Sequence, residues 1–242
     1  MIKNFIWLIM LAWVLLPLTV FAEESKWQDE AELSYVSTGG NTDVTSLSGK
    51  NKLTYQFTEK LKGQWDVSAL YGETDDVKTA ERYATKVRLD YDLTQRLYVG
   101  GSGGWLKDEF AGIEQRLYVG PTLGYKILTG PKHTLIAEGG IDYVAEEYTN
   151  DEDADFMRGR ALGGYEFLLT EKSKFSQTLE LLYDFEDSDN YNVNSVTALI
   201  TSLSDTFSIK TSYEIAYDNE PVPDDLEETD TILSVALIVN FK

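Results

Sequence analysis

The sequence predicts an all-β fold, a transmembrane antiparallel up-and-down β-barrel of about 12 strands, and three observations carry this prediction. Apolar and polar residues alternate with period two in stretches of about ten to twelve residues. Such stretches are longer than the five or six residues usual in globular proteins and match the roughly 9 to 11 that a tilted strand needs to cross a bilayer. Aromatic residues such as Phe57, Trp65 and Tyr125 stand near the ends of the apolar faces, as in the aromatic girdles of membrane barrels.

The N-terminal segment is predicted to be a secretory signal peptide. One lysine precedes an apolar run over residues 5–21, and small or apolar residues at 20 and 22 form a V-x-A cleavage pattern. An uncleaved membrane anchor is the alternative, which Pro17 and the V-x-A exit disfavour. We therefore expect residues 1–22 to be removed on export and residues 23–242 to form a single barrel domain.

Composition excludes several classes of protein. The chain has no cysteine, so it uses neither disulfides nor thiol-bound metal. Its net charge is −20, and removing Lys3 with the signal makes it −21. Such a charge repels phosphates, which argues against nucleic acid as a partner. No apolar run of helix-spanning length follows Ala22, which argues against a helical membrane protein.

Twelve alternating stretches are predicted as strands. They span residues 27–37, 44–57, 63–73, 81–92, 96–107, 113–127, 134–146, 155–168, 175–186, 193–203, 207–218 and 230–241. The same alternation could build a soluble two-sheet sandwich with the apolar face inward, or an outer-membrane barrel with the apolar face toward lipid. Strand length and aromatic placement favour the barrel. The faces of 193–203, which has no charge, are left unassigned, and Pro121 is expected to cause a bulge.

The connections also fit a barrel of the outer membrane. Short connections near 58–62, 92–95, 129–132, 170–174 and 204–206 interleave with longer acidic ones near 37–43, 73–80, 107–112, 146–154, 186–192 and 218–229. Short periplasmic turns and long external loops are the arrangement of such barrels, and an even strand count places both termini in the periplasm.

The last strand has an amphipathic pattern of its own. Leu233, Val235, Leu237, Val239 and Phe241 share one face. A terminal amphipathic strand that ends on an aromatic resembles the signal by which barrels are recognised for assembly. We therefore expect the barrel-assembly machinery as a partner during insertion, although Lys242 follows the aromatic and departs from the pattern.

The polar faces of the strands are predicted to line the lumen. The acids assigned there are Glu30, Glu32, Asp66, Asp90, Glu114, Glu138, Asp142, Glu166, Glu180, Asp184 and Glu214. The bases are Lys50, Lys52, Arg82, Lys86, Arg88, Arg116, Lys126, Arg158, Arg160 and Lys210. Eleven acids against ten bases can form either an ion-pair lattice that fills a narrow barrel or the wall of a wet pore, and we favour a narrow, partly filled lumen.

The segment S-T-G-G-N-T-D at 37–43, after a strand with Trp27, Leu33 and Tyr35 in a W-x-x-x-x-x-L-x-Y pattern, resembles the YdiY-like family. Its members are uncharacterised Gram-negative proteins described as salt-induced outer membrane proteins. The resemblance runs across the mature chain and implies an outer-membrane β-barrel. It implies no substrate, activity or catalytic residue.

No enzyme site, cofactor or strong metal site is predicted. His133, the one histidine, lies in a predicted periplasmic turn, away from any loop-side cleft that a Ser-His site would need. The acidic loops 146–155 and 218–228 offer oxygen ligands without the spacing of an EF-hand. They could bind divalent cations weakly between the protein and lipopolysaccharide. We expect lipopolysaccharide and outer-membrane lipid to surround the protein.

The expected function is that of an outer-membrane protein exported by its signal peptide. A narrow porin-like pore and a barrel for envelope maintenance, linked to salt stress as the family description implies, are the two leading forms. A non-conducting structural or interaction barrel and a soluble periplasmic binding barrel remain as alternatives.

Overall fold

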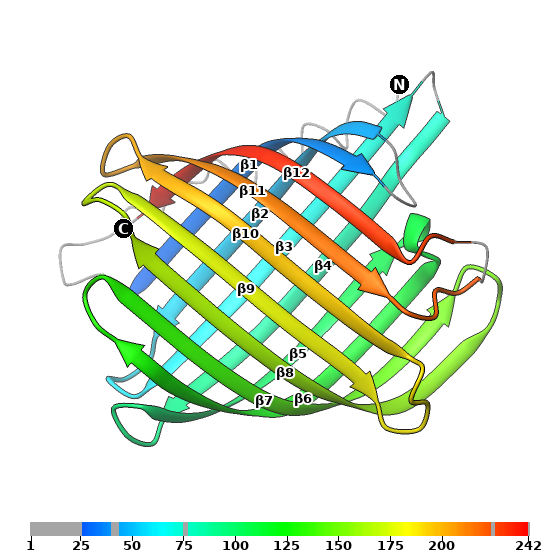
Figure 1. Ribbon diagram of the computed structural model, residues 1–242, viewed down its shortest axis with the longest axis horizontal. Coiled ribbons are helices and arrows are strands. Elements are labelled where there is room, and N and C mark those ends of the chain that lie inside the picture. The colour runs from blue at the N-terminus through cyan, green and yellow to red at the C-terminus, as the bar shows by residue number, and fades with distance from the viewer. Residues whose placement is uncertain (1–25, 40–43, 75–76, 224–225, 242) are drawn as a thin grey trace.

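The computed structural model describes residues 26–39, 44–74, 77–223 and 226–241, and their backbone forms one closed barrel (Figure 1). The strands are β1 (Trp27–Gly39), β2 (Val44–Gln56), β3 (Leu61–Thr74), β4 (Val77–Asp92), β5 (Leu97–Asp108), β6 (Ile113–Thr129), β7 (His133–Tyr148), β8 (Asp153–Leu168), β9 (Ser173–Asp184), β10 (Tyr191–Ser202), β11 (Phe207–Asp218) and β12 (Thr229–Phe241). All twelve predicted strands are present, and their ends differ from the prediction by four residues or fewer.

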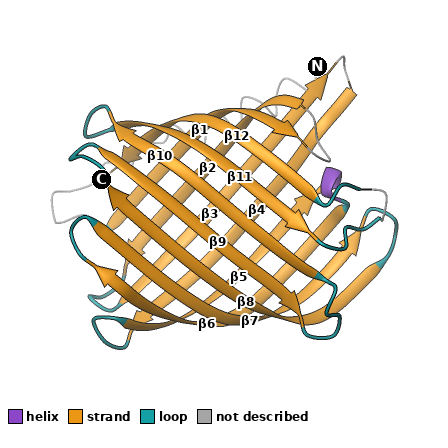
Figure 2. Cartoon of the chain, viewed as in Figure 1, coloured by secondary structure: helices purple, strands orange, loops and turns teal. Residues whose placement is uncertain are grey.

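Each strand pairs antiparallel with its neighbours in sequence, and β12 pairs with β1 to close the ring. The closing register runs from Asp29 opposite Phe241 to Gly39 opposite Thr231. The up-and-down barrel predicted from the alternation is therefore confirmed. One short 3-10 helix, η1 (Glu109–Ala111), follows β5 (Figure 2). At its start the Asp108 carboxylate accepts a hydrogen bond from the Ala111 amide. Within the described residues, no helix is long and apolar enough to cross a bilayer.

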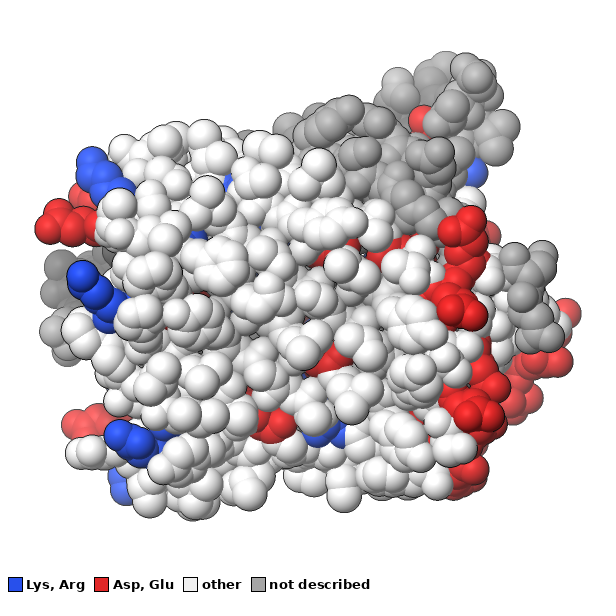
Figure 3. Space-filling view, in the orientation of Figure 1, with Lys and Arg blue, Asp and Glu red and all other residues white. Residues whose placement is uncertain are grey.

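The barrel is apolar outside and polar inside. Val119, Leu123 and Val87 are 60%, 53% and 54% exposed on the outer face, whereas Asp142 and Arg158 are only 1% and 5% exposed in the interior. Between its two ends the visible outer surface is mostly uncharged (Figure 3). This inversion of the soluble pattern is the arrangement of membrane barrels.

The two ends of the barrel differ in charge more than in loop length. By sequence, the six connections at the end of η1 hold fourteen acids and no base, while the five at the other end hold three acids and four bases. We call these the acidic end and the short-turn end; acidic side chains collect at the first, on the right in Figure 3, and basic ones stand at the second.

The predicted contrast in loop length is only partly correct. Connections 185–190 and 219–228 are long, but 149–152 is no longer than the turn 169–172 at the opposite end. The reason is that strand pairing continues into segments expected to be loops, as at Glu147, which pairs with Asp153. Polar, acidic composition had marked these segments as loops, although it does not prevent a hairpin from extending.

Two local expectations are also settled. The prediction of a bulge at Pro121 is wrong, because the pairing of β6 with β7 keeps the same register at Val119 and at Thr122. A proline omits one ladder hydrogen bond without adding a residue to the strand. The faces of β10, unassigned from sequence, are now clear: Asn194 and Val196 line the interior, and Leu199 lies on the outer face.

The signal peptide predicted at residues 1–22 and the turn at 40–43 within the S-T-G-G-N-T-D segment lie outside the described residues.

The apolar outer face leads to a first prediction. The change Val119→Arg is expected to lower the free energy of unfolding from lipid vesicles by about 2–4 kcal/mol, because it places a charge against the hydrocarbon of the bilayer. Val119→Leu is the control and should change little. A cost below about 0.5 kcal/mol for the arginine, the level of an ordinary surface substitution in water, would contradict a lipid-facing Val119.

Candidate functional site: the charged lumen

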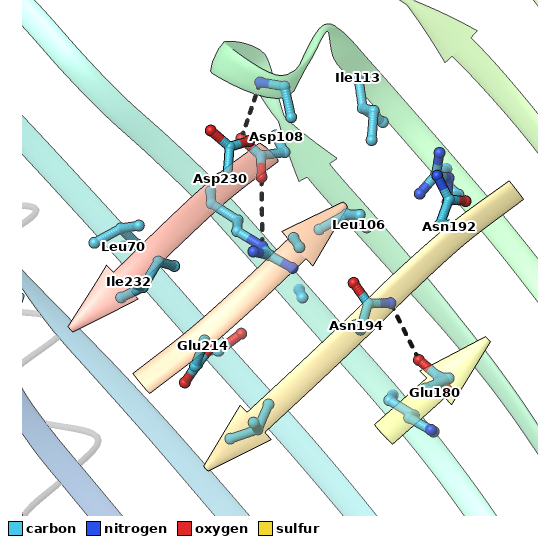
Figure 4. Close-up of a pocket in the computed structure, with 18 of the residues that line it drawn as sticks. Leu70, Leu106, Asp108, Ile113, Glu180, Asn192, Asn194, Glu214, Asp230 and Ile232 are labelled. Atoms are coloured by element: carbon cyan, nitrogen blue, oxygen red, sulfur yellow. Dashed lines mark hydrogen bonds and ion pairs between the residues drawn. The ribbon is translucent and has the colours of Figure 1, made fainter. Parts of the chain in front are cut away.

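The barrel encloses a cavity of about 680 Å³ that reaches the acidic end. Asp108, Phe110 and Glu228 line it at that end, and it extends to Glu30 and Asp66 nearer the short-turn end. Figure 4 shows side chains from several strands, among them Glu180, Asn194 and Glu214, around this space. The cavity is the candidate functional site.

Most of the charged residues assigned to the lumen border this cavity. Fourteen do so: Glu30, Glu32, Lys50, Lys52, Asp66, Arg82, Lys86, Arg116, Asp142, Arg158, Arg160, Glu180, Lys210 and Glu214. Arg88 donates to both Asp90 and Glu138 in the wall beside it. Asp184 is buried and accepts hydrogen bonds from the Glu186 amide and the Asn190 side chain.

Three other assigned residues lie at the ends of the barrel. Glu166 pairs with Lys174 at the short-turn end, with both side chains substantially exposed, and Lys126 pairs with Asp92 at the same end. Glu114 was assigned to the lumen wrongly. A register shift between Ile113 and Gln115 interrupts the alternation, so that Ile113 lines the cavity and Glu114 is exposed beside Lys107.

Two ion pairs bridge the seam where the barrel closes. Lys210 of β11 donates to Glu32 of β1 at 2.8 Å, and Lys50 of β2 donates to Glu214 of β11 at 2.7 Å. Both pairs pass over β12, which lies between β1 and β11 and presents small residues such as Ala236 inward. Lys210 passes over Ala236, its small register partner on β12, to reach Glu32 on β1, and the pair of Lys50 with Glu214 passes over both β1 and β12.

A second polar cluster, which we call the Glu138 layer, fills the interior beside β4–β8. It consists of Arg88, Tyr98, Thr122, Glu138 and Arg160. Arg88 donates to both oxygens of Glu138, at 2.9 and 2.7 Å, and the Tyr98 hydroxyl donates to the same carboxylate at 2.6 Å. Arg160 donates to Thr122 at 2.7 Å. Bidentate arginine–carboxylate geometry fixes orientation as well as adding energy, so this layer forms a well-defined filling.

Glycines on the inner wall make room for the Glu138 layer. A Cβ on Gly124 would lie 2.1 Å from the Tyr98 ring, and one on Gly100 would lie 2.4 Å from an Asp90 carboxylate oxygen. Tyr98 itself is only 5% exposed. Sequence reasoning missed this interior tyrosine because it grouped aromatics with the outer girdles; its alternation with Gly100, Ser102 and Gly104 on one face was the available signal.

The expected weak cation sites and the histidine can also be placed. Among the described residues, no group of three or more His, Cys, Asp or Glu side chains is arranged to hold a metal ion. Two residues of the acidic segment 218–228, at 224–225, lie outside the described part. His133 lies exposed at the short-turn end, where its Nδ1 and the Tyr165 hydroxyl share a hydrogen bond of 2.8 Å.

Comparisons with known proteins agree with this architecture. A family model described as "Protein of unknown function, DUF481" matches residues 31–241. The uncharacterized protein YdiY of Escherichia coli (strain K12) is 28% identical over 203 residues, which cover 84% of this chain and 79% of that protein. The resemblance to the YdiY-like family is confirmed, whereas none of these matches supports the link to salt.

Solved structures share the fold at low sequence identity. The NanC porin aligns with a TM-score of 0.60 at 10% identity over 88% of this chain and 99% of that one. An outer membrane channel from Pseudomonas putida F1 aligns with a TM-score of 0.58 at 11% identity over 94% and 100%. The translocator domain of the autotransporter NalP from Neisseria meningitidis aligns with a TM-score of 0.56 at 12% identity over 91% and 90%. The fold is thus one of outer-membrane barrels and resembles porins and channels.

The seam leads to a second prediction. The change Lys210→Ala should lower the free energy of unfolding by about 3–5 kcal/mol, because it leaves the carboxylate of Glu32, a residue only 5% exposed, without its cation. The double change Glu32→Gln with Lys210→Gln should cost less than the sum of Glu32→Gln alone and Lys210→Gln alone. A double-mutant cycle measured by urea titration in lipid vesicles checks this.

The exposed pair at the short-turn end supplies the matched control. Lys174→Ala, which breaks the pair with Glu166, should cost at most about 1 kcal/mol. Equal costs at the two pairs would contradict a special role for the seam.

Proposed function

This chain belongs to the DUF481 family, described as proteins of unknown function, and from that premise we propose that it is an exported integral outer-membrane barrel whose lumen conducts small ions or polar solutes. The observation that carries the proposal is the cavity of about 680 Å³, lined by charged side chains, inside a closed barrel with an apolar outer face. A water-filled path through an apolar membrane needs this combination of surfaces.

The orientation follows from the two ends. We place the short-turn end in the periplasm and the acidic end outside, as in other outer-membrane barrels. The acidic end then faces lipopolysaccharide, where divalent cations could bind weakly between acids of the protein and anionic lipid. β12, with its outward apolar face ending at Phe241, would be read by the assembly machinery during insertion.

The charge of the cavity supports a preference for cations. Asp108, Asp218, Glu227, Glu228 and Asp230 line it toward the acidic end. An entrance lined by one sign of charge raises the local concentration of the opposite ion. We therefore propose that cations enter more readily than anions at low ionic strength.

A second candidate function is a barrel that does not conduct. The Glu138 layer favours it, since Arg88, Tyr98 and Arg160 fill the space beside β4–β8 and are fixed by bonds of 2.6–2.9 Å to Glu138 and Thr122. In that case the barrel would serve the envelope as a scaffold or an interaction partner.

A soluble binding barrel would have to expose the belt formed by Val87, Val119 and Leu123 to water. These side chains are 54%, 60% and 53% exposed, and they belong to a much larger set of exposed apolar residues. Soluble proteins rarely expose apolar patches beyond a few hundred Å², so the membrane location is the better supported one.

Recording from planar bilayers tests the proposed channel. The full mature chain is expected to give discrete single-channel current steps. In a KCl gradient at low salt, the reversal potential should lie closer to the equilibrium potential of potassium than to that of chloride, because the acidic entrance attracts cations. Protein folded in the same detergent but heat-denatured before addition is the control. Folded protein that inserts into the bilayer without any steps would overturn conduction and leave the scaffold.

The Glu138 layer gives a further prediction. Removing both partners by Arg88→Ala with Glu138→Ala should increase the single-channel conductance, because the filling beside the cavity is lost. The matched control is Lys174→Ala with Glu166→Ala at the short-turn end, which removes a pair outside the layer. An unchanged conductance in the layer variant would show that the layer does not limit the path.

A further inference from the structure

The bases that line the cavity fall into two groups. Six of them lie in ion pairs: Lys50, Arg82, Arg116, Arg158, Arg160 and Lys210. Lys52 and Lys86 also line the cavity, but in the described part of the chain neither forms an ion pair or a side-chain hydrogen bond. A cavity that otherwise balances its bases with fixed carboxylates thus contains two amines without a fixed partner.

The two amines belong to one row of the sheet. Lys52 of β2 is the register partner of Asp66 on β3, and Asp66 is the register partner of Lys86 on β4. Asp66 could have neutralised either lysine, but its carboxylate accepts a hydrogen bond of 2.7 Å from the Gln64 amide instead. On its other side Lys52 is the register partner of Glu30 on β1, so the row alternates two acids with two lysines, and neither lysine is bonded to the carboxylate beside it.

The surroundings of Lys86 hold charges of both signs. Its amine interacts electrostatically with Arg160 and Arg88 as well as with Glu180 and Asp66. The two arginines already donate to carboxylates, Arg88 to Glu138 and Arg160 to Glu180. On the side toward β5, the register partner of Lys86 is Gly104, which has no side chain to act as an acceptor.

We propose that Lys52 and Lys86 form an anion-contact site in the lumen, which takes a small monovalent anion such as chloride or a carboxylate. A mobile anion that meets Lys50 or Lys210 must compete with a carboxylate already bound at 2.7–2.8 Å. Lys52 and Lys86 form no such bond with a carboxylate in the described part of the chain. The role in selectivity rests on the proposed conduction, but the binding of an anion does not.

This site lies farther along the lumen than the acidic entrance. An anion that passes Asp108 and Glu228 meets the two amines farther in, and a cation that enters by the same route meets the same charges with the opposite effect. The two lysines would supply the part of the current that anions carry, and their removal should leave a channel that is more selective for cations.

Reversal potentials measure this effect. In the full mature chain, Lys52→Gln with Lys86→Gln should raise the ratio of potassium to chloride permeability by at least about twofold, because the local excess of anions at the amines is lost. Lys52→Arg with Lys86→Arg keeps the charge and should retain the original ratio. Gradients of potassium chloride and of potassium acetate distinguish an inorganic anion from a carboxylate as the preferred occupant.

Two controls separate a local effect from a loss of net charge. Lys60→Gln with Lys172→Gln removes the same charge from turns at the short-turn end and should leave the ratio unchanged. A glutamine variant at 52 and 86 with the same ratio as the parent, or an equal rise in the turn variant, would overturn the role of these amines in selectivity.

Anion binding can be tested even if the barrel does not conduct. The detergent-solubilised parent should broaden the chlorine NMR line of dissolved chloride more than the variant with glutamine at positions 52 and 86, because chloride exchanges with the unpaired amines. If the variant loses this broadening and the parent does not conduct, the proposed conduction is wrong but the anion site stands. Equal broadening in parent and variant would remove the site, whatever the conductance.

Discussion

The structure depends on the closure of one hydrogen-bonded ring. In an apolar surrounding, backbone N–H and C=O groups find no partner in the solvent, so every strand must pair on both of its edges. β12 meets this requirement by pairing with β1 from Phe241 to Thr231, and no strand edge is left open in the described barrel. The ring in turn fixes which side chains face outward and which face one another across a narrow interior.

Closure also explains the form of the interior. A ring of twelve strands brings charged side chains from distant parts of the sequence within contact, and pairs such as Glu32 with Lys210 span the seam that the backbone closes. On the opposite wall, Gly124 gives up side-chain volume so that Tyr98 can lie against the sheet and reach Glu138. The cavity is the space that these two polar networks leave between them.

Much of this could be predicted from the sequence, because alternation with period two is a local property. It located all twelve strands and most of the cavity's charges. It could not predict the partners of those charges: Lys50 and Glu214 are 164 residues apart, and their contact depends on the closure that brings β2 and β11 to within two strands of each other. Glu114 was misplaced for a related reason, since a register shift beside Ile113 reverses the faces and leaves no clear mark on composition.

The distribution of charge links the fold to what the lumen can do. A charge that is bonded within the wall stabilises the ring, but it is largely unavailable to a mobile ion. Function must therefore come from charges that a mobile ion can reach, among them the acids that line the entrance and the amines of Lys52 and Lys86. Exposed charges are screened over about 8 Å at physiological ionic strength, and partly buried ones are screened less. The acidic entrance should therefore control which ions enter at low salt, and the enclosed amines should make a relatively larger contribution to ion selectivity as the salt concentration rises.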